Sequence, residues 1–224
     1  MKIKDIKGLK YPDEYFIKYF FKNSFSSKEN LLFAEFGCGN GNNLTLAYEY
    51  GFEVLGVDIN ESAIEDANYN FNKIKTDTKF EFYLCEMIDF AKENKDLQID
   101  VLLLPNVVNY IKKEQLLEFF NIMLLNNNIK KEASFFIRCR ELKDFRFGIG
   151  ENLGENTYLM PKDYDITSEA SCINKFYSEY ELIEMLKKSL NLKEYFVFHN
   201  EFQNLQKNNT LVFNADIILW GVIN

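Results

Sequence analysis

The sequence predicts an α/β protein, a three-layer α/β/α sandwich around a mostly parallel seven-stranded sheet. Short apolar runs alternate with longer amphipathic stretches through the first 140 residues, as strands and crossover helices do in such folds. Ile99 to Leu104 is a largely aliphatic run, which is typical of a strand that is buried on both faces. Two more apolar runs near the end of the chain predict a closing pair of strands.

Capping and turn residues delimit the predicted elements. Pro12, followed by two acids, opens a first helix, since proline suits the first turn and acids its positive end. Gly51 ends a helix that begins near Asn42. Ser178 and Glu181 form a capping box that opens the last helix, residues 178–190. Strands are expected at residues 31–36, 53–58, 79–85, 99–104, 133–140, 192–202 and 211–222, and the remaining helices at residues 61–71 and 112–125.

The 224 residues are expected to form a single domain, because this length suits one sizeable core. Residues 1–30 would be an N-terminal helical segment with an aromatic face. Residues 141–177 show little regular pattern, and a loop of that length is unusual unless it is functional. We expect a lid or an inserted hairpin over the active site there, with strands at residues 157–160 and 172–177.

Composition and charge argue against several classes of protein. A net charge of −8 and a pI near 4.9 disfavour a nucleic-acid partner, because phosphate contacts need a basic face. The longest apolar run, residues 217–223, is too short to cross a membrane. The N-terminus lacks the apolar core of a signal peptide, so a cytoplasmic protein is expected. The four cysteines show no C-x-x-C spacing and the chain has a single histidine, so no metal site is expected.

The most informative segment is the ten-residue stretch from Ala34 to Asn43. Glu35 follows an apolar run, and glycines stand at positions 37, 39 and 41 on a predicted strand-to-helix turn. Glycine lets a ligand approach the backbone, and the N–H groups that open the helix face that ligand. A second acid, Asp58, ends the next apolar run. A dinucleotide would require G-x-G-x-x-G, whereas the spacing here is G-x-G-x-G, and Glu35 would repel a pyrophosphate but suit an ammonium group.

This stretch resembles motif I of the class I S-adenosylmethionine-dependent methyltransferases, whose cofactor has an ammonium group and no phosphate. The resemblance covers residues 30–125 best and implies a Rossmann-like methyltransferase fold whose last strand inserts antiparallel. It also implies S-adenosylmethionine as cofactor, with Glu35 at its methionine end, Asp58 on the ribose hydroxyls and Ile59 over the adenine. An unspecific tight turn in a degenerate Rossmann-like fold is the alternative. The expected cofactor-binding residues are Tyr11, Glu35, Gly37, Cys38, Gly39, Gly41, Asn42, Asp58, Ile59, Glu86, Met87 and Asn106.

Some of these residues lie outside the glycine turn. By resemblance, Glu86 would accept the adenine amino group and Met87 would pack on the ring, although the family often has a Gly-Asp pair where this chain has Cys85 and Glu86. Asn106 follows the fourth strand and would contact the methionine part, and Tyr11 would close over the cofactor. The alternatives are a solvated loop acid for Glu86, a helix-initiating turn for Asn106 and a packing aromatic for Tyr11.

Arginines at the end of the fifth strand are the best indication of the substrate. Arg138 and Arg140 share a face there and Arg146 begins the long loop, and arginine is favoured for bidentate recognition of carboxylate or phosphate. Together with Tyr110 they are the predicted substrate residues, and they indicate an anionic acceptor. The alternative is a set of ion pairs with nearby acids: Glu141, Asp144 and Glu151.

The catalytic residues are left open, with Asn106 and His199 as candidates. His199 could act as a general base near neutral pH, although the sequence favours the alternative, a half-exposed histidine on an edge strand.

The sequence is thus interpreted as a methyltransferase that acts on a small, anionic metabolite or sugar derivative. An oxygen or nitrogen would attack the sulfonium methyl in line, and the protein would supply mainly proximity and orientation. The glycine turn and the segment from Phe176 to Leu182 also resemble tellurite-resistance methyltransferases. The alternatives are a non-catalytic S-adenosylmethionine-binding partner subunit and a nicotinamide oxidoreductase, which the glycine spacing and Glu35 disfavour.

Overall fold

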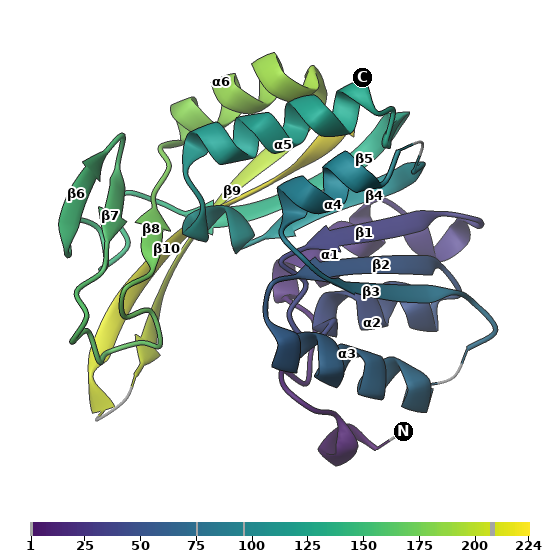
Figure 1. Ribbon diagram of the computed structural model, residues 1–224, viewed down its shortest axis with the longest axis horizontal. Helices are drawn as coiled ribbons and strands as arrows, with labels where there is room; N and C mark the ends of the chain where they lie inside the picture. The colour runs from purple at the N-terminus through teal and green to yellow at the C-terminus, as the bar shows by residue number, and fades with distance from the viewer. Residues whose placement is uncertain (1, 75, 96, 207–208) are drawn as a thin grey trace.

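The computed structural model describes residues 2–74, 76–95, 97–206 and 209–224, and within them seven strands form one sheet in the order β3-β2-β1-β4-β5-β10-β9 (Figure 1). Strands β1 to β5 are parallel, and β10 runs antiparallel between β5 and β9. The predicted antiparallel insertion of the last strand is therefore confirmed. The strands are β1 (Leu32–Phe36), β2 (Glu53–Asp58), β3 (Phe80–Leu84), β4 (Ile99–Pro105), β5 (Ile129–Arg140), β9 (Leu192–Leu205) and β10 (Leu211–Ile223).

Helices cover both faces of this sheet, which gives the predicted three layers. One face carries α1 (Glu14–Lys22), α2 (Asn42–Glu49) and α3 (Glu61–Ile74), and the other carries α4 (Met87–Glu93), α5 (Lys113–Leu125) and α6 (Glu179–Leu190) (Figure 1). Short 3-10 helices add η1 (Ile3–Asp5), η2 (Phe25–Ser27) and η3 (Val107–Tyr110). Strand order reverses between β1 and β4, and ligands bind at the carboxyl ends of the strands beside such a reversal.

Both expected helix starts form, but Pro12 lies before α1 rather than in its first turn, and the expected capping box of α6 has only its serine bond. Asp13 caps α1 by accepting from the backbone N–H groups of Tyr15 and Phe16, at 2.8 and 3.2 Å. The Ser178 hydroxyl accepts from the Glu181 N–H at 3.1 Å and so opens α6.

Helix α4 and the early start of β5 were not predicted. Helix α4 is only seven residues long, too short for a periodic apolar pattern to stand out. Strand β5 begins at Ile129, four residues earlier than expected, because Ile129 pairs with Ile99 across an irregularity in the β4–β5 ladder.

The core on the α1 side is built from aromatic rings. Phe136 of β5 lies 5.2 Å from the ring centroid of Tyr19 and 6.0 Å from that of Phe16, both on α1, and stacks on Trp220 of β10 at 6.5 Å. The Tyr19 hydroxyl donates to Ser134 Oγ at 2.5 Å, which satisfies the one polar atom of that fully buried side chain. Helix α1 is thereby fixed to the strands whose ends carry the arginines.

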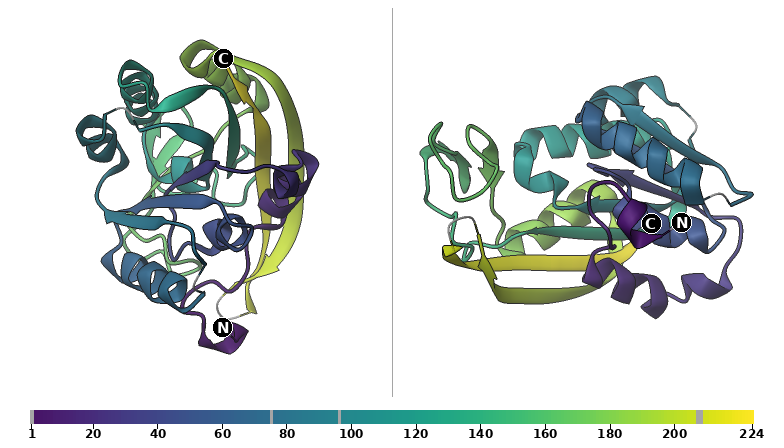
Figure 2. Two further views of the ribbon diagram at one scale, coloured as in Figure 1. Left: turned by 90° about the vertical axis from the view of Figure 1, so that its right-hand side faces the viewer. Right: turned by 90° about the horizontal axis from the view of Figure 1, so that it is seen from below.

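The segment between β5 and α6 forms a second sheet. β6 (Glu151–Gly154), β7 (Thr157–Leu159) and β8 (Ile173–Lys175) pair antiparallel in that order, and β8 packs against η3. We call residues 141–177 the insert. Its sheet stands beside the far end of the β9–β10 hairpin, which projects beyond the main sheet (Figures 1 and 2). A bridge between Glu141 and Tyr177 closes the base of the insert.

Replacing Phe136 by alanine should remove the ring that joins α1 to the sheet. We expect the free energy of unfolding to fall by about 3–5 kcal/mol, the usual cost of a cavity left by a buried phenylalanine, measured by urea denaturation. Phe213, whose side chain is 57 % exposed on β10, is the matched control, and Phe213→Ala should change stability by only about 0.5 kcal/mol. Equal losses in the two variants would contradict this account of the core.

Candidate cofactor and acceptor site

The carboxyl ends of β1 and β2 are joined by the glycine turn. The N–H groups of Gly37 and Cys38 both donate to the Val57 carbonyl, at 2.8 and 3.2 Å, so the turn is fixed to the end of β2. Gly37 and Gly41 have φ of +73°, and a Cβ at either position would lie within 3 Å of neighbouring side chains. Gly39 differs, because a Cβ there would meet nothing within 4 Å. The turn therefore packs inward at its two ends and leaves its middle open.

Asp58 lies directly beside this open middle. Its Oδ2 accepts from the Gly39 N–H at 2.8 Å and its Oδ1 from the Asn60 N–H at 2.9 Å. The apolar side chain of Ile59, the next residue along the chain, is 67 % exposed, and Tyr11, in the N-terminal segment, is 65 % exposed. Oriented carboxylate oxygens next to uncovered apolar surface suit a ligand with hydroxyls and a planar ring.

Glu35 is buried at the end of β1 with only one of its oxygens satisfied. Oε1 accepts from Asn43 Nδ2 at 2.8 Å, whereas Oε2 is buried without a hydrogen-bond partner in the part of the chain that the structure describes. Burial raises the pKa of this carboxyl to about 8; the Asn43 bond opposes the rise, and the negative charges of Asp13 and Asp58 add to it. A bound cation at Oε2 would supply the missing partner.

Asparagines bind the segment from residue 7 to residue 13 across the start of α2. Asn40 bonds the backbone of Lys7 and Leu9, and Asn42 Nδ2 donates to the Tyr11 carbonyl at 2.9 Å. Asn43 Oδ1 accepts from the Asp13 N–H at 2.7 Å, so one amide joins Glu35 to the cap of α1. Sequence reasoning missed Asn40 and Asn43 as positioning residues, although both stand within the motif.

The residues expected after β3 and β4 lie at the same edge. Cys85 N–H donates to the Asp58 carbonyl at 3.1 Å, which brings the end of β3 to Asp58. Glu86 is exposed at the N-cap of α4, and Met87 is buried. Asn106 has φ of +64° and its N–H donates to the Arg138 carbonyl at 2.8 Å, so the turn after β4 is held against β5.

Arg138 does not face an open site. Its guanidinium bonds Asp216 of β10, with Nη2 to Oδ2 at 2.5 Å, and also bonds the second oxygen of Asp13. Two carboxylates from fixed elements therefore balance its charge. Arg138 thus forms structural ion pairs, which was the alternative to a substrate role, but its partners are Asp13 and Asp216 and not the acids expected from the sequence.

Arg140 and Arg146 converge on a residue that sequence reasoning missed, Glu169. Oε1 of Glu169 accepts from Arg140 and from the Tyr110 hydroxyl, at 2.8 Å for the tyrosine, and Oε2 accepts from Arg146 Nε at 2.8 Å and from Thr167 Oγ1 at 2.6 Å. Burial alone would raise the pKa of Glu169, but Arg140, Thr167 and Arg146 hold it below its usual value. No local motif marks Glu169, because Arg140, Arg146 and Tyr110 are 23 to 59 residues away along the chain.

His199 lies on the opposite face of the sheet. It pairs in register with Ile217 of the α4–α6 core, and its Nδ1 and Nε2 lie 3.0 and 2.7 Å from carboxylate oxygens of Glu141 and Glu179. Hydrogen bonds to these two acids raise the pKa of His199. Glu35, Arg138 and Arg140 are on the α1–α3 face, so the structure separates His199 from them.

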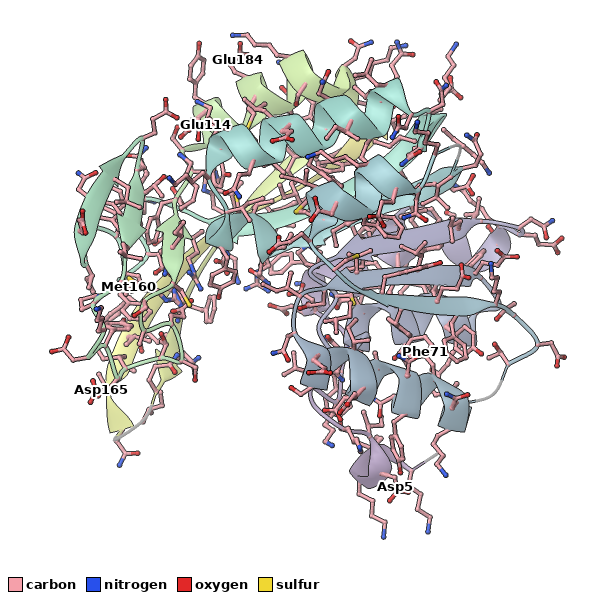
Figure 3. All side chains as sticks on the ribbon, viewed as in Figure 1. Asp5, Phe71, Glu114, Met160, Asp165 and Glu184 are labelled. Atoms are coloured by element: carbon pink, nitrogen blue, oxygen red, sulfur yellow. The ribbon has the colours of Figure 1, made fainter. Side chains whose placement is uncertain are left out.

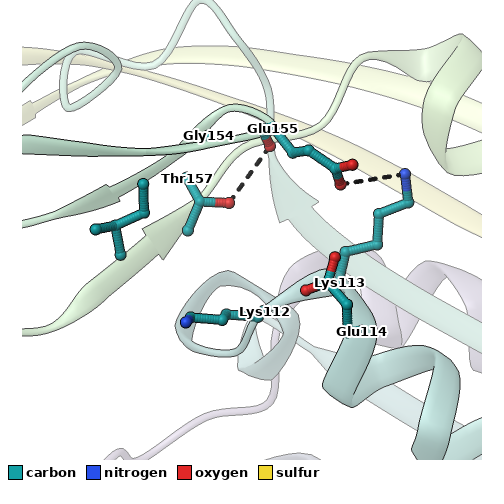
Figure 4. A pocket seen from close by; sticks show the side chains of 7 residues that line it. Lys112, Lys113, Glu114, Gly154, Glu155 and Thr157 are labelled. Carbon is teal, nitrogen blue, oxygen red and sulfur yellow. Dashed lines mark hydrogen bonds and ion pairs between the residues drawn. The ribbon is translucent and has the colours of Figure 1, made fainter.

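A separate cavity of about 160 Å³ lies between the start of α5 and the β6–β7 turn (Figure 4). Lys113 faces it but is 3.4 Å from Glu155 and 3.7 Å from Glu181. Its charge is thus already compensated, and none of the residues expected to bind the cofactor lines this cavity.

Comparison with known proteins identifies the family. A model of the methyltransferase domain matches residues 27–214. The chain belongs to that family. S-adenosylmethionine is the methyl donor of the family, so the protein is an S-adenosylmethionine-dependent methyltransferase, and the nicotinamide alternative is set aside. Comparison with curated protein sequences found no match.

Solved structures share the fold at low sequence identity. A methyltransferase from Methanosarcina mazei is 17 % identical, with a TM-score of 0.62 over 91 % of this chain and 98 % of that one. TehB from Haemophilus influenzae is 15 % identical, with a TM-score of 0.64 over 95 % and 62 %. Magnesium protoporphyrin IX methyltransferase from Synechocystis PCC 6803, solved with bound S-adenosylmethionine, is 11 % identical, with a TM-score of 0.59 over 94 % and 77 %.

The residues present fit this cofactor. The unpartnered Oε2 of Glu35 suits its ammonium group, the open face of Gly39 leaves room for its body, and Asp58 has oxygens for the ribose hydroxyls. Within residues 2–74, 76–95, 97–206 and 209–224, no helix is both long and apolar enough to cross a membrane.

Gly39→Ala tests whether the open middle of the turn is the cofactor surface. Gly51 is the matched control, because it also has positive φ, +85° against +53°, and nothing within 4 Å of an added Cβ. Each variant should lose roughly 1–2 kcal/mol of stability through backbone strain. Only Gly39→Ala should also weaken S-adenosylmethionine binding, by at least ~10-fold in calorimetry. Unchanged affinity in Gly39→Ala would mean that the glycine serves the turn alone.

Cofactor binding should release a proton from Glu35. Its pKa near 8 means that the carboxyl is mostly protonated at pH 7 in the free protein, and an ammonium partner favours the charged form. Calorimetry at pH 7 in buffers of different ionisation enthalpy should detect release of about one proton per cofactor, and affinity should rise as pH rises toward 8. Glu35→Gln should bind more weakly and release no proton. Release of no proton by the unaltered protein would contradict the assignment.

Proposed function

We propose that the protein transfers the methyl group of S-adenosylmethionine to an oxygen or nitrogen of a small, anionic acceptor, such as a metabolite or sugar derivative. The observation that supports this is the adjacency of two sites on one sheet edge. Glu35 and Asp58 would hold the cofactor at the ends of β1 and β2, and Arg140 and Arg146 lie with Tyr110 beyond the end of β5.

The chain's own residues would contribute mainly binding and orientation. Glu35 would hold the ammonium, Asp58 would accept from the ribose hydroxyls, and Asn106 would contact the methionine part where the turn after β4 meets β5. Bound S-adenosylmethionine supplies a methyl group that its sulfonium already activates. The residues at the strand ends would hold the attacking oxygen or nitrogen in line with that methyl group, and any proton that this atom loses on methylation would pass to solvent water. Holding the two reactants in line can supply much of the rate enhancement, so a dedicated base is not required.

Two arginines, rather than the three expected from the sequence, support an anionic acceptor. Arg138 is neutralised by Asp13 and Asp216 and is left out of the proposal. Arg140 and Arg146 remain, since the acid they share comes from the insert. The likeness to TehB shows the fold alone, so the tellurite-resistance alternative stays a prediction, as does the non-catalytic partner subunit.

The test supplies methyl-labelled S-adenosylmethionine and a deproteinised metabolite extract, followed by anion-exchange chromatography and mass spectrometry. We expect label in a small anionic compound. Asp58→Ala should lose at least ~10-fold in cofactor affinity, because each charge-assisted bond contributes roughly 1.5–3 kcal/mol, and should lose labelling with it. Glu53→Ala, at the opposite end of β2, is the control and should behave as the unaltered protein. Tight cofactor binding with no labelled product from any extract would favour the non-catalytic subunit.

A further inference from the structure

The carboxylate of Glu169 occupies a site whose two arginines and one tyrosine come from outside its own loop. Four donors reach its two oxygens, and the side chain is only 9 % exposed. Arg140, Arg146 and Tyr110 lie outside the loop of residues 160–172, whereas Thr167 lies within it. Two arginines and one hydroxyl would therefore remain for a ligand if the loop moved, and paired arginines are what recognition of a carboxylate favours. The site adjoins the predicted methyl-transfer edge, because Arg140 ends β5 and Tyr110 follows the turn after β4.

Charge balance shows what the site must contain. In the part of the chain that the structure describes, Glu169 is the one carboxylate within ion-pair distance of Arg140, whereas Arg146 also pairs with Asp144 at 2.7 Å. Without Glu169, two buried guanidinium groups would face a single carboxylate. A buried unpaired charge is strongly destabilising, so only a ligand with its own negative charge could take the place of Glu169.

Three buried amides around the arginines add donors that nothing uses. Asn109, Asn174 and Asn214 accept, through Oδ1, from the Arg140 N–H, from Arg140 Nη1 and from Arg146 Nη2 respectively. Their Nδ2 groups are buried with no acceptor among the described residues. Unsatisfied buried donors are uncommon in folded proteins. Donors left over beside two arginines indicate a ligand with more acceptor atoms than Glu169 provides.

Glu169 lies on a different part of the fold from Arg140. It lies in the loop between β7 and β8, whereas Arg140 and Asn214 are on β5 and β10 of the main sheet. Met160 and Asp165, labelled in Figure 3, show this loop beside the β9–β10 hairpin. The strands of the main sheet all lie outside residues 160–172, so outward movement of this loop, whose Asp165 is exposed, would not break that sheet.

We propose that the Arg140–Arg146 pair is the subsite for a carboxylate of the methyl acceptor, and that Glu169 occupies it until the acceptor displaces it. The inference rests on the proposed function for the identity of that ligand as the acceptor. Binding would exchange one carboxylate for another, which keeps the charge balance and releases the loop of residues 160–172. A neutral compound would leave the arginines unpaired and would be rejected.

The experiment measures the response of Glu169→Ala to acetate at constant ionic strength, without cofactor. Loss of the carboxylate should lower Tm by on the order of 10 °C. Acetate at about ten times its Kd should raise Tm again by roughly 3–6 °C, because it fills the vacated place. Asp165→Ala, in the same loop, should match the unaltered protein and show no acetate effect. Adding Arg140→Ala to Glu169→Ala should abolish the effect.

Hydrogen exchange on the unaltered protein tests the displacement itself. A saturating carboxylate that stabilises Glu169→Ala should increase exchange in residues 160–172 and leave β5 unchanged. If Glu169→Ala does not fold, Glu169→Gln keeps the volume without the charge, and the same acetate titration is performed on it. The proposal is overturned if no acetate effect is found, if Arg140→Ala leaves it intact, if phosphate stabilises and acetate does not, or if exchange in the loop is unchanged. None of these readouts uses methyl transfer, so they can fail while cofactor binding and labelling succeed.

Discussion

The free oxygen of Glu35 is the constraint on which the cofactor half of the site depends. A buried carboxylate with one unpartnered oxygen is costly, so it either holds a proton or acquires a cation. Asn43 positions the other oxygen and, through its own Oδ1, also holds the cap of α1. Asn43 thereby links Glu35, the start of α2 and the N-terminal segment through two hydrogen bonds.

A second constraint operates along the edge formed by β5 and β10. Arg140 and Arg146 are buried there and Arg138 is half-buried. Four carboxylates pair with these arginines: Asp13, Asp144, Glu169 and Asp216. The partners of Arg138 belong to the cap of α1 and to β10, so that pair is part of the scaffold. Glu169 belongs to the insert. The arginine–carboxylate ion pairs therefore have a structural role at Arg138, whereas at Arg140 and Arg146 we propose that the carboxylate can be exchanged for that of a ligand.

Long segments with a periodic apolar pattern were predicted well. Short elements, and a strand end that is set by pairing with another strand, were not. The helix expected at residues 112–125 is α5, at Lys113–Leu125, and the strand expected at residues 53–58 is β2 with the same bounds. α4 and β6 were missed, because seven- and four-residue elements are set by the surfaces on which they pack. The early start of β5 depends on pairing with β4, a partner thirty residues away, which local propensity cannot encode.

By itself, the sequence determined the fold class and the cofactor class. Glu35 and Asp58 lie at the ends of two consecutive strands, and the three glycines follow the first of these ends. The order of these residues along the chain therefore already indicates the glycine turn. Only the tertiary structure decided which arginines remain available, which face of the sheet His199 occupies and which carboxylate stands between Arg140 and Arg146. Those outcomes depend on contacts between residues 20 to 125 positions apart. Such contacts form only when the strands are ordered in the sheet, and a sequence pattern read locally holds no record of them.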